Sequence, residues 1–498
     1  MIRILYLSVA FSACCLFSSP SKASHNNPDL RNQIESLMAS FQLDSAEALL
    51  PALNRPGYAN FYRYNIRVYQ YLSTQSISYL QNIRGDWKVC IQKVSELPSD
   101  DPLRGVMLAE IYCKRAILEF LEKNYLSAVR FTRQGRAQIN RNEKRFPGNV
   151  EQMKVLGLFN VTLGAVPSKY QWLTNTLGFR GDIEEGLQQL SIAAASSQLL
   201  RLEAQILYAF VERNVLGDPQ LALNRLAGER AQQGPNILLD YFLANAYLNN
   251  RQTDQALEIF NRRSQYRKEG IFFIPYWDYQ MGKAYYYKGA QRDAQRYLSK
   301  FLKNYTGKLF RTDAYFRLGM SLSLDGSYPV GKRFFKLITE QENSGMDQDE
   351  YAAFMAQTFL KQPPSPASLQ LFQARNFFDG GYFEQATASL DSLTQSGSSL
   401  SQDELTEKYY RMGRIHHAQQ QFSEAIVAYQ QCVAQNCQHQ RYVQAYSYYY
   451  LGEIARQKGA DTEARNHYKS ALNFDDIFYQ GGLENRCKTA LGEMKRQP

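Results

Sequence analysis

Cysteine and histidine are the residues of this sequence whose chemistry could build a reactive site. Four of them, Cys432, Cys437, His416 and His439, are near enough in the chain for facing helices to bring them to one zinc ion. Their spacing matches no regular set of zinc ligands. His416 and Cys432 also fall where the helical repeat described below requires a core Tyr and a small Ala, so packing or a disulfide explains them better. We therefore expect no metal and no cofactor.

Disulfide formation is the other chemistry open to these cysteines. Cys90 and Cys113 lie on either side of a turn at 98–102, where two antiparallel helices would bring them level. Cys432 and Cys437 can pair only if a helix ends between them. Because spacing does not determine connectivity, Cys90–Cys113 and Cys432–Cys437 are candidate bonds that an oxidising compartment would permit.

Motifs with a catalytic mechanism do not occur in the sequence, which has no HExxH, no GxSxG, no Walker loop and no repeated CxxC. No catalytic residue is therefore predicted. The formal net charge is +10, but Lys and Arg are dispersed among acidic residues and form no block of five or six. This dispersal favours a solvated basic surface over a nucleic-acid site, and we expect no nucleic-acid partner.

The elements that must position any site are helices. Residues 276–302 have the pattern of two amphipathic helices joined by a tight turn at Gly289. Gly282 on the first helix and Ala294 on the second are small where the two would cross, and Leu298 fills the space beside them. One such pair cannot bury its apolar face alone, so it requires similar pairs stacked on either side.

This pattern resembles the tetratricopeptide repeat (TPR), a 34-residue helix-turn-helix unit. Six copies are present, and in each a second small residue follows the first by twelve positions. The first small residues are separated by 38, 37, 55, 39 and 39 positions, and the long interval leaves room for one extra helix at 349–360. These first small residues are Ala244, Gly282, Gly319, Ala374, Gly413 and Gly452.

A second resemblance covers about thirty residues of the irregular N-terminal half. Residues 163–190 are similar to a segment of a eukaryotic TPR family that includes a yeast inclusion-body clearance protein. Within it, Gly178 can end one helix and Asp182 can cap the next. Residues 58–91 are also predicted to be helical, with an interruption near Gly85.

The predicted fold is all-α: helix-turn-helix repeats stacked into a right-handed TPR solenoid, with an irregular helical N-terminal region. We expect a signal peptide at 1–23, an N-terminal domain with degenerate repeats at 24–198, the TPR array at 199–479 and a capping helix at 480–498. The last helix is expected to start at Leu483, after two glycines.

The first 23 residues have the features of an export signal. Arg3 supplies a positive start, residues 4–17 are apolar but short for a membrane span, and 21–23 form a small-x-small cleavage site. In a less favoured alternative, Cys14 becomes the lipidated first residue of an outer-membrane lipoprotein. Because no other apolar run approaches bilayer length, we expect an exported bacterial protein of the periplasm or cell envelope without a transmembrane helix after signal removal.

The TPR resemblance implies a place for a partner, because the first helix of each TPR pair lines a concave groove. The implied partner is another protein or peptide, bound as an extended segment or a helix by aromatic contacts and by cations that meet its acids. Transfer by register gives these groove residues: Tyr241, Asn245, Leu248, Tyr276, Tyr279, Lys283, Tyr286, Phe316, Met320, Arg375, Phe378, Tyr410, Arg414, His417, Tyr446, Tyr449 and Arg456.

Two alternatives accompany this interpretation. Any single tyrosine of the set is about as well explained by packing against a neighbouring repeat. The chain as a whole could also be an enzyme, or an accessory subunit of one, that acts on envelope polymers and uses the array for docking. The carboxylate clamp of chaperone-docking TPRs is not expected, because only Asn245 matches it and Tyr241 stands where a cation belongs.

Overall fold

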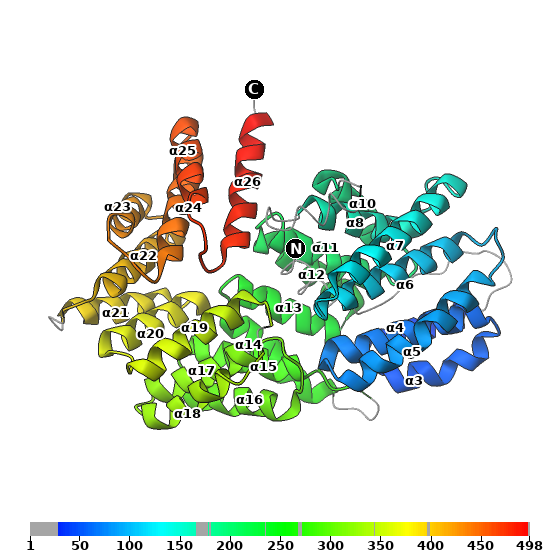
Figure 1. Cartoon of the computed structure of the whole chain (residues 1–498), viewed down its shortest axis with the longest axis horizontal. Helices are drawn as coiled ribbons and strands as arrows, with labels where there is room; N and C mark the ends of the chain where they lie inside the picture. Colours follow the sequence, from blue (N-terminus) through cyan, green and yellow to red (C-terminus); the bar gives the residue numbers. More distant parts are fainter. Residues whose placement is uncertain are drawn as a thin grey trace. The chain divides into compact units, whose positions relative to one another are not determined.

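The computed structural model describes residues 28–165, 178, 181–234, 236–266, 271–342, 344–395 and 399–496. Over these ranges the regular elements are helices and no strand occurs (Figure 1). This confirms the predicted all-α class of stacked helix-turn-helix pairs. No helix in the described ranges combines the length and apolarity needed to cross a membrane. The predicted signal peptide, residues 1–23, lies outside the described residues.

The chain divides into two compact units, and the division passes through three helices. Unit 1 runs to Tyr247 and adds Gln255–Trp277 and Tyr305–Gly307. Unit 2 consists of Leu248–Asp254, Asp278–Asn304 and the residues from Lys308 onward.

The helices of the first half of the chain have the following bounds: α2 (Pro28–Ala39), α3 (Leu43–Leu49), η1 (Leu50–Leu53), α4 (Pro56–Thr74), α5 (Ile77–Ser95), α6 (Pro102–Leu121), α7 (Tyr125–Arg145), η2 (Val150–Gln152), α8 (Met153–Gly164), α10 (Ile183–Ser196), α11 (Arg201–Asn214), α12 (Pro219–Gln233), α13 (Ile237–Asn249), α14 (Thr253–Asn261) and η4 (Arg262–Tyr266). Those of the second half are α15 (Pro275–Lys288), α16 (Gln291–Asn304), α17 (Arg311–Leu324), α18 (Tyr328–Ile338), α19 (Asp347–Lys361), α20 (Pro366–Gly380), α21 (Phe383–Gln395), α22 (Gln402–Ala418), α23 (Phe422–Val433), α24 (Arg441–Gln457), α25 (Asp461–Leu472) and α26 (Gln480–Arg496).

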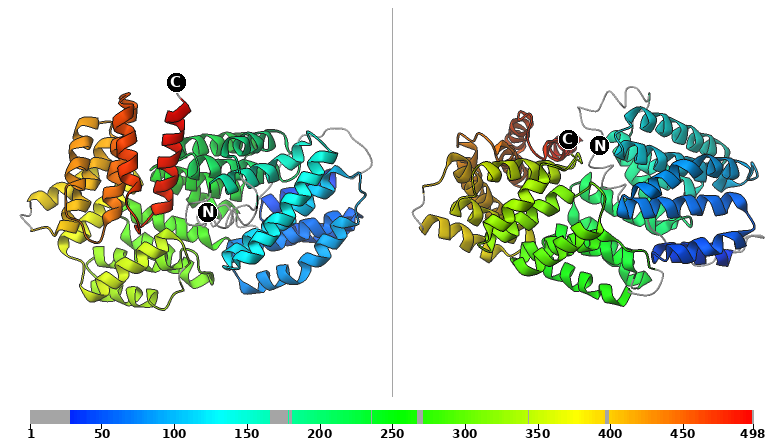
Figure 2. Two further views of the ribbon diagram at one scale, coloured as in Figure 1. Left: turned by 45° about the horizontal axis from the view of Figure 1, so that its top comes forward. Right: turned by 60° about the horizontal axis from the view of Figure 1, so that its bottom comes forward.

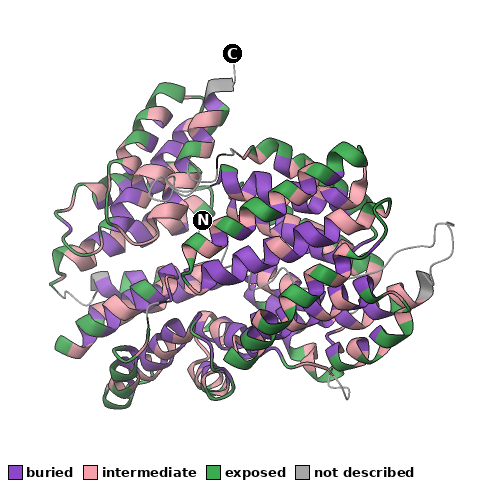
Figure 3. Ribbon diagram, turned by 45° about the vertical axis from the view of Figure 1, so that its right-hand side comes forward, coloured by how far each residue is buried: buried purple, intermediate pink, exposed green. Residues whose placement is uncertain are grey.

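Close helix crossings give the repeats their register. A Cβ atom on Gly282 would lie 2.7 Å from Leu298 Cγ, and one on Gly319 would lie 2.5 Å from Phe335 Cε1. In both pairs the facing large residue comes sixteen positions after the glycine. Figure 2 shows the successive hairpins of unit 2 side by side. In Figure 3 buried residues mark the contacting sides of the helices and exposed residues the outer sides.

The extra helix predicted between the third and fourth repeats is present as α19. It packs on α17 and α18, while α20 pairs with α21. Asp349 on α19 also supplies an N-terminal cap to α17. Its carboxylate accepts the backbone N–H of Phe310 at 3.0 Å and that of Asp313 at 2.8 Å. The position before α17 is Phe310, which has φ +62° and no oxygen in its side chain, so the inserted helix completes the start of its neighbour.

Two predicted boundaries are wrong. Gly85 does not interrupt a helix, because α5 continues through it; the break comes at Gln75, which has φ +52° and closes α4. The last helix starts at Gln480 rather than Leu483 and includes both glycines. The predicted cap at Asp182 is confirmed, since its side chain accepts from the N–H groups of Glu184 and Glu185.

Candidate functional site

The predicted groove residues divide into two groups by burial. Seven aromatic members are buried, and several of them hydrogen-bond inside their own unit. Tyr276 Oη lies 2.6 Å from Tyr305 Oη in unit 1, and Tyr279 Oη donates to Asp313 Oδ2 at 2.7 Å in unit 2. These rings therefore serve packing, the alternative that the sequence had left open for any single tyrosine. The seven are Tyr241, Tyr276, Tyr279, Tyr286, Phe316, Phe378 and Tyr410.

The second group is half-buried and keeps part of each side chain in contact with solvent. Asn245 donates to the carbonyl of Tyr241 at 2.7 Å, and Arg456 pairs with Glu493 at 2.8 Å. Tyr446 Oη donates to the carbonyl of Tyr479 at 3.1 Å. Partner binding by this group stays a prediction. Its members are Asn245, Lys283, Arg375, Arg414, His417, Tyr446, Tyr449 and Arg456.

Two half-buried arginines of unit 2 stack on one aromatic ring. The guanidinium carbon of Arg251 lies 4.5 Å from the centroid of Phe378, and that of Arg414 lies 4.8 Å from the same centroid. Arg414 also lies 4.4 Å from the ring centroid of Tyr450, and it donates to Tyr410 Oη at 3.0 Å. We call these five residues the Arg–Tyr cluster. They come from the α13–α14 turn and from α20, α22 and α24.

The charges of the Arg–Tyr cluster act on a neighbouring histidine. His417 packs against Tyr450 and Tyr429, with ring centroids 5.6 and 6.1 Å apart. Burial, and then Arg414 and Arg251, lower the pKa of His417 to about 4. The imidazole is therefore neutral at pH 7, and the positive charge of this region belongs to the two arginines.

Sequence reasoning found Arg414 but missed Arg251 and Tyr450. Arg251 lies in the turn after α13, outside the groove positions that a TPR register assigns. It reaches the cluster because that turn packs on the end of α20, where a Cβ on Gly381 would lie 1.9 Å from the Arg251 carbonyl oxygen. Gly381 has φ +86°, and a glycine at this position was the only signal in the sequence for such a close approach.

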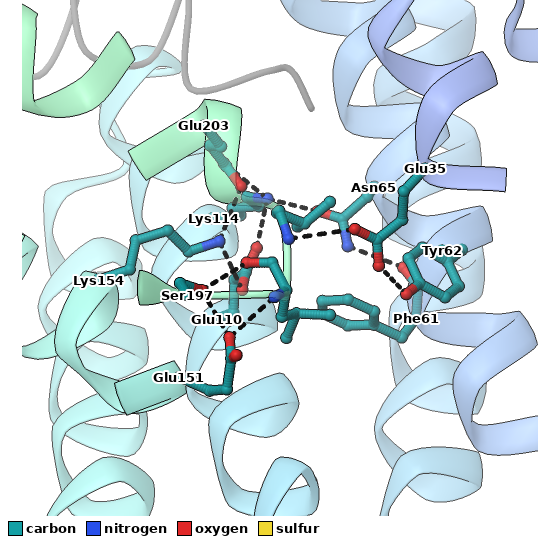
Figure 4. Close-up of polar contacts among 12 residues, drawn as sticks. Glu35, Phe61, Tyr62, Asn65, Glu110, Lys114, Glu151, Lys154, Ser197 and Glu203 are labelled. Carbon is teal, nitrogen blue, oxygen red and sulfur yellow. Dashed lines mark hydrogen bonds and ion pairs between the residues drawn. The ribbon is translucent and has the colours of Figure 1, made fainter. Parts of the chain in front are cut away.

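Unit 1 holds a separate buried cluster of four charges (Figure 4). Lys114 Nζ lies 2.7 Å from Glu110 and 2.9 Å from Glu203, while Lys154 Nζ lies 3.2 Å from Glu110 and 2.9 Å from Glu203. Lys114 also donates to Asn65 on α4. Two positive and two negative side chains from α6, α8 and α11 thus alternate, with no net charge. Glu110 and Glu203 are in this way both paired with lysines.

Pairing keeps the four groups ionised despite burial. Burial alone would raise the pKa of Glu110, but Lys114 and Lys154 hold it at about 2. Burial would lower the pKa of Lys154, but Glu110 and Glu203 raise it. All four groups are engaged in ion pairs, which join α6, α8 and α11. An i,i+4 Glu–Lys pair within the largely apolar run 106–114 was the sequence signal that could have revealed it.

Two further carboxylates of unit 1 hold backbone amides (Figure 4). Glu151 accepts from Gln198 N at 2.6 Å and Leu199 N at 2.8 Å. Glu35 accepts from Leu200 N at 3.2 Å and from the Tyr62 hydroxyl. Both carboxylates therefore secure the residues that precede α11, where Leu200 has φ +54°.

The five cysteines within the described ranges are free thiols, so neither candidate disulfide is formed. Cys90 donates instead to the carbonyl of Asn60 at 3.3 Å, and Cys437 donates to Asp403 Oδ1 at 3.1 Å. Burial raises the pKa of the thiols of Cys90, Cys113, Cys432, Cys437 and Cys487 to about 12. Protonated thiols are poor nucleophiles and poor metal ligands.

The residues weighed as zinc ligands do not converge. Cys432 is fully buried, as the small-residue position of its repeat requires, whereas His439 is exposed. His416 is half-buried and bonds Gln421 Oε1 through Nδ1 at 2.7 Å, so it does not fill the core position expected for Tyr. Among the described residues no group of three or more His, Cys, Asp or Glu side chains is placed to hold a metal ion.

Comparison with known proteins identifies the repeats. The family model described as Iml2/Tetratricopeptide repeat protein 39 matches residues 112–344, a range that contains the segment 163–190 for which the sequence indicated this relationship. A tetratricopeptide repeat model matches residues 410–477. The chain therefore contains tetratricopeptide repeats, as predicted. The comparison with curated proteins gave no match.

Solved structures with similar helical repeats include a human IFIT1 dimer with PPP-AAAA. It shares 13% identity with this chain at a TM-score of 0.32, over 94% of this chain and 93% of that one. The crystal structure of yeast Tom70 shares 11% identity at a TM-score of 0.30, over 89% of this chain and 95% of that one. Likenesses this weak carry no functional argument.

Proposed function

We propose that this protein is a scaffold that binds another protein or peptide through the half-buried face of its TPR array. The observation that carries the proposal is the set of half-buried Arg and Tyr side chains on the first helices of matched repeats. Arg414 on α22 and Tyr446 on α24 both lie within the range 410–477. The ring centroids of Tyr446 and Tyr450 are 6.4 Å apart, and the ring of Tyr450 lies against the guanidinium group of Arg414. Side chains of these types give large contact areas and hydrogen bonds to a protein partner.

We further propose that the scaffold is an exported bacterial protein of the periplasm or cell envelope. Support comes from the sequence of residues 1–23, with a positive start, a short apolar run and a small-x-small site. In this setting the partner is a protein or peptide of the envelope.

Site-specific photocrosslinking tests the binding face. A photoreactive phenylalanine derivative replaces Tyr446 in the full chain, and intact cells are irradiated before purification and mass spectrometry. The matched control places the same group at Val427 on α23, a residue that is 54% exposed. We expect a discrete protein adduct at position 446 and none at 427. Equal adducts at both positions, or none at 446, would contradict binding through this face.

A further inference from the structure

The Arg–Tyr cluster is the part of unit 2 in which inward cations lack acidic partners. Other arginines of unit 2 have such partners: Arg317 Nε lies 2.5 Å from Asp313 Oδ2, and Arg411 Nη2 lies 2.6 Å from Glu407 Oε1. Among the described residues, no carboxylate lies within ion-pair distance of Arg251 or Arg414, which instead face the ring of Phe378 from 4.5 and 4.8 Å. A half-buried cation without a counter-ion has lost part of its hydration, and an incoming anion can compensate for that loss.

The acid that acts on Arg251 is already engaged. Asp379 interacts with Arg251 only from a distance, and its carboxylate lies 3.8 Å from Arg375. The two unpaired guanidinium groups also oppose each other, since burial and then Arg414 lower the pKa of Arg251. Two like charges are therefore held close together by their packing on Phe378, an arrangement that a bound anion between or beside them would relieve.

The geometry leaves both guanidinium groups able to bind a ligand. Arg251 and Arg414 are each half-buried, so part of each side chain is open to solvent. Stacking on aromatic rings occupies the flat faces of a guanidinium group and leaves its N–H edge available. Arg414 uses one N–H group on Tyr410 Oη at 3.0 Å, and the others can form a paired contact with a carboxylate.

We propose that Arg251 and Arg414 form an anion subsite that binds the carboxylate of an acidic side chain on a peptide partner. This inference rests on the proposed scaffold function and specifies the chemistry of its ligand. A peptide fits better than a nucleic acid, because these two cations and Arg486, which lies over the Tyr449 ring and near Arg414, match only a few carboxylates. A phosphate backbone requires a longer track of cations. Here the adjacent Arg375 and Arg411 lie beside Asp379 and Glu407.

The test measures binding of a fluorescent Glu-rich peptide to the full chain, with a Gln-rich peptide of equal length as the ligand control. Arg414→Gln and Arg251→Gln are expected to weaken binding of the Glu-rich peptide about tenfold or more. Arg414→Lys keeps the charge but loses the planar fork, so an intermediate loss is expected. The matched protein control is Arg292→Gln, an exposed arginine on α16, with no expected change.

Three results would overturn the subsite. The first is that the parent chain fails to bind the Glu-rich peptide. The second is that Arg414→Gln and Arg292→Gln bind the peptide equally well. The third is that a single-stranded RNA 12-mer binds more tightly than the peptide and that its binding depends on Arg414. Circular dichroism confirms that each variant is folded. The photocrosslink at position 446 separates the two proposals. If the adduct persists in Arg414→Gln and peptide binding is unchanged, the scaffold proposal is supported and the subsite is contradicted. If the parent chain forms no adduct, the scaffold proposal itself is contradicted.

Discussion

Gly413 on α22 lies directly against the ring of Tyr429 on α23. A Cβ atom at Gly413 would lie 2.6 Å from both Cδ1 and Cε1 of that ring. Tyr429 is fully buried, so its ring has no free space to move into. The same relationship, with a small residue facing a large one sixteen positions later, recurs at Gly452 and Tyr468.

Gly413→Ala is expected to lower the free energy of unfolding by about 1–3 kcal/mol, because the added methyl group overpacks the crossing of α22 and α23. The measurement is chemical denaturation followed by circular dichroism. An unchanged transition would show that the assigned repeat register is wrong for this pair.

Gly85→Ala is expected to have the opposite sign, a gain of about 0.5–1 kcal/mol. Gly85 lies inside α5 with an ordinary helical φ, and nothing is within 4 Å of an added Cβ. The substitution then acts mainly by restricting the unfolded chain. Denaturation followed by tryptophan fluorescence suits this variant, since Trp87 and Trp277 both lie in unit 1. A loss of stability would mean that α5 is bent or broken near residue 85.

Lys154→Met is expected to lower the free energy of unfolding of unit 1 by about 3–5 kcal/mol. The change leaves Glu110 and Glu203 buried with a single lysine between them, and an uncompensated buried charge is costly. Tryptophan fluorescence during denaturation provides the measurement. Lys88→Met on α5 is the matched control, because Lys88 is exposed and its loss should change the stability by less than about 0.5 kcal/mol. Similar transitions in the two variants would contradict the assigned charge cluster.

Glu35→Gln is expected to flatten the pH dependence of the stability of unit 1. Burial raises the pKa of Glu35 from 4.5 to about 7, despite the nearby Arg31. The folded chain therefore holds a proton that the unfolded chain releases, and the wild type loses stability as the pH rises from about 4.5 to 7.

Glutamine cannot titrate, yet it can still accept from Leu200 N and donate to Tyr62. The variant should lack this loss, which amounts to at most about 3 kcal/mol. Unfolding free energies at a series of pH values from 4 to 8 measure the difference. Parallel pH profiles for parent and variant would show that Glu35 has an ordinary pKa.

The mature N-terminus is expected at Ser24 if residues 1–23 are an export signal. N-terminal sequencing of the protein purified from cells checks this. A lipid-modified Cys14 would support the tethered alternative, and an intact Met1 in the cytosol would exclude both.

Much of the repeat architecture could be predicted from the sequence, because small residues at fixed intervals report close helix crossings directly. The twelve-residue spacing located the hairpins, and the excess interval before Ala374 located α19. The turn at Gln75 could not be predicted in this way. Glutamine does not favour the φ of +52° that Gln75 adopts. The turn forms because the helices on either side of it, α4 and α5, are held in place by packing.

The binding face was harder to predict than the fold. A register assigns the positions on a helix face, but it does not say which of those rings a neighbouring repeat covers. Tyr279 and Tyr446 occupy groove positions by register, yet Tyr279 is buried against Asp313 whereas Tyr446 is half-buried. Arg251 was missed because its position depends on contact between a turn and a repeat more than a hundred residues later.

The cap that Asp349 provides to α17 has a consequence for the order in which the protein can assemble on the ribosome. The backbone N–H of Asp313 and its acceptor are separated by 36 residues, with the whole of α18 between them. While the chain is synthesised, the first turn of α17 therefore emerges without its acceptor and must wait for α19. Three helices, rather than the usual hairpin of two, thus form the smallest part of this region that can complete its own backbone hydrogen bonds.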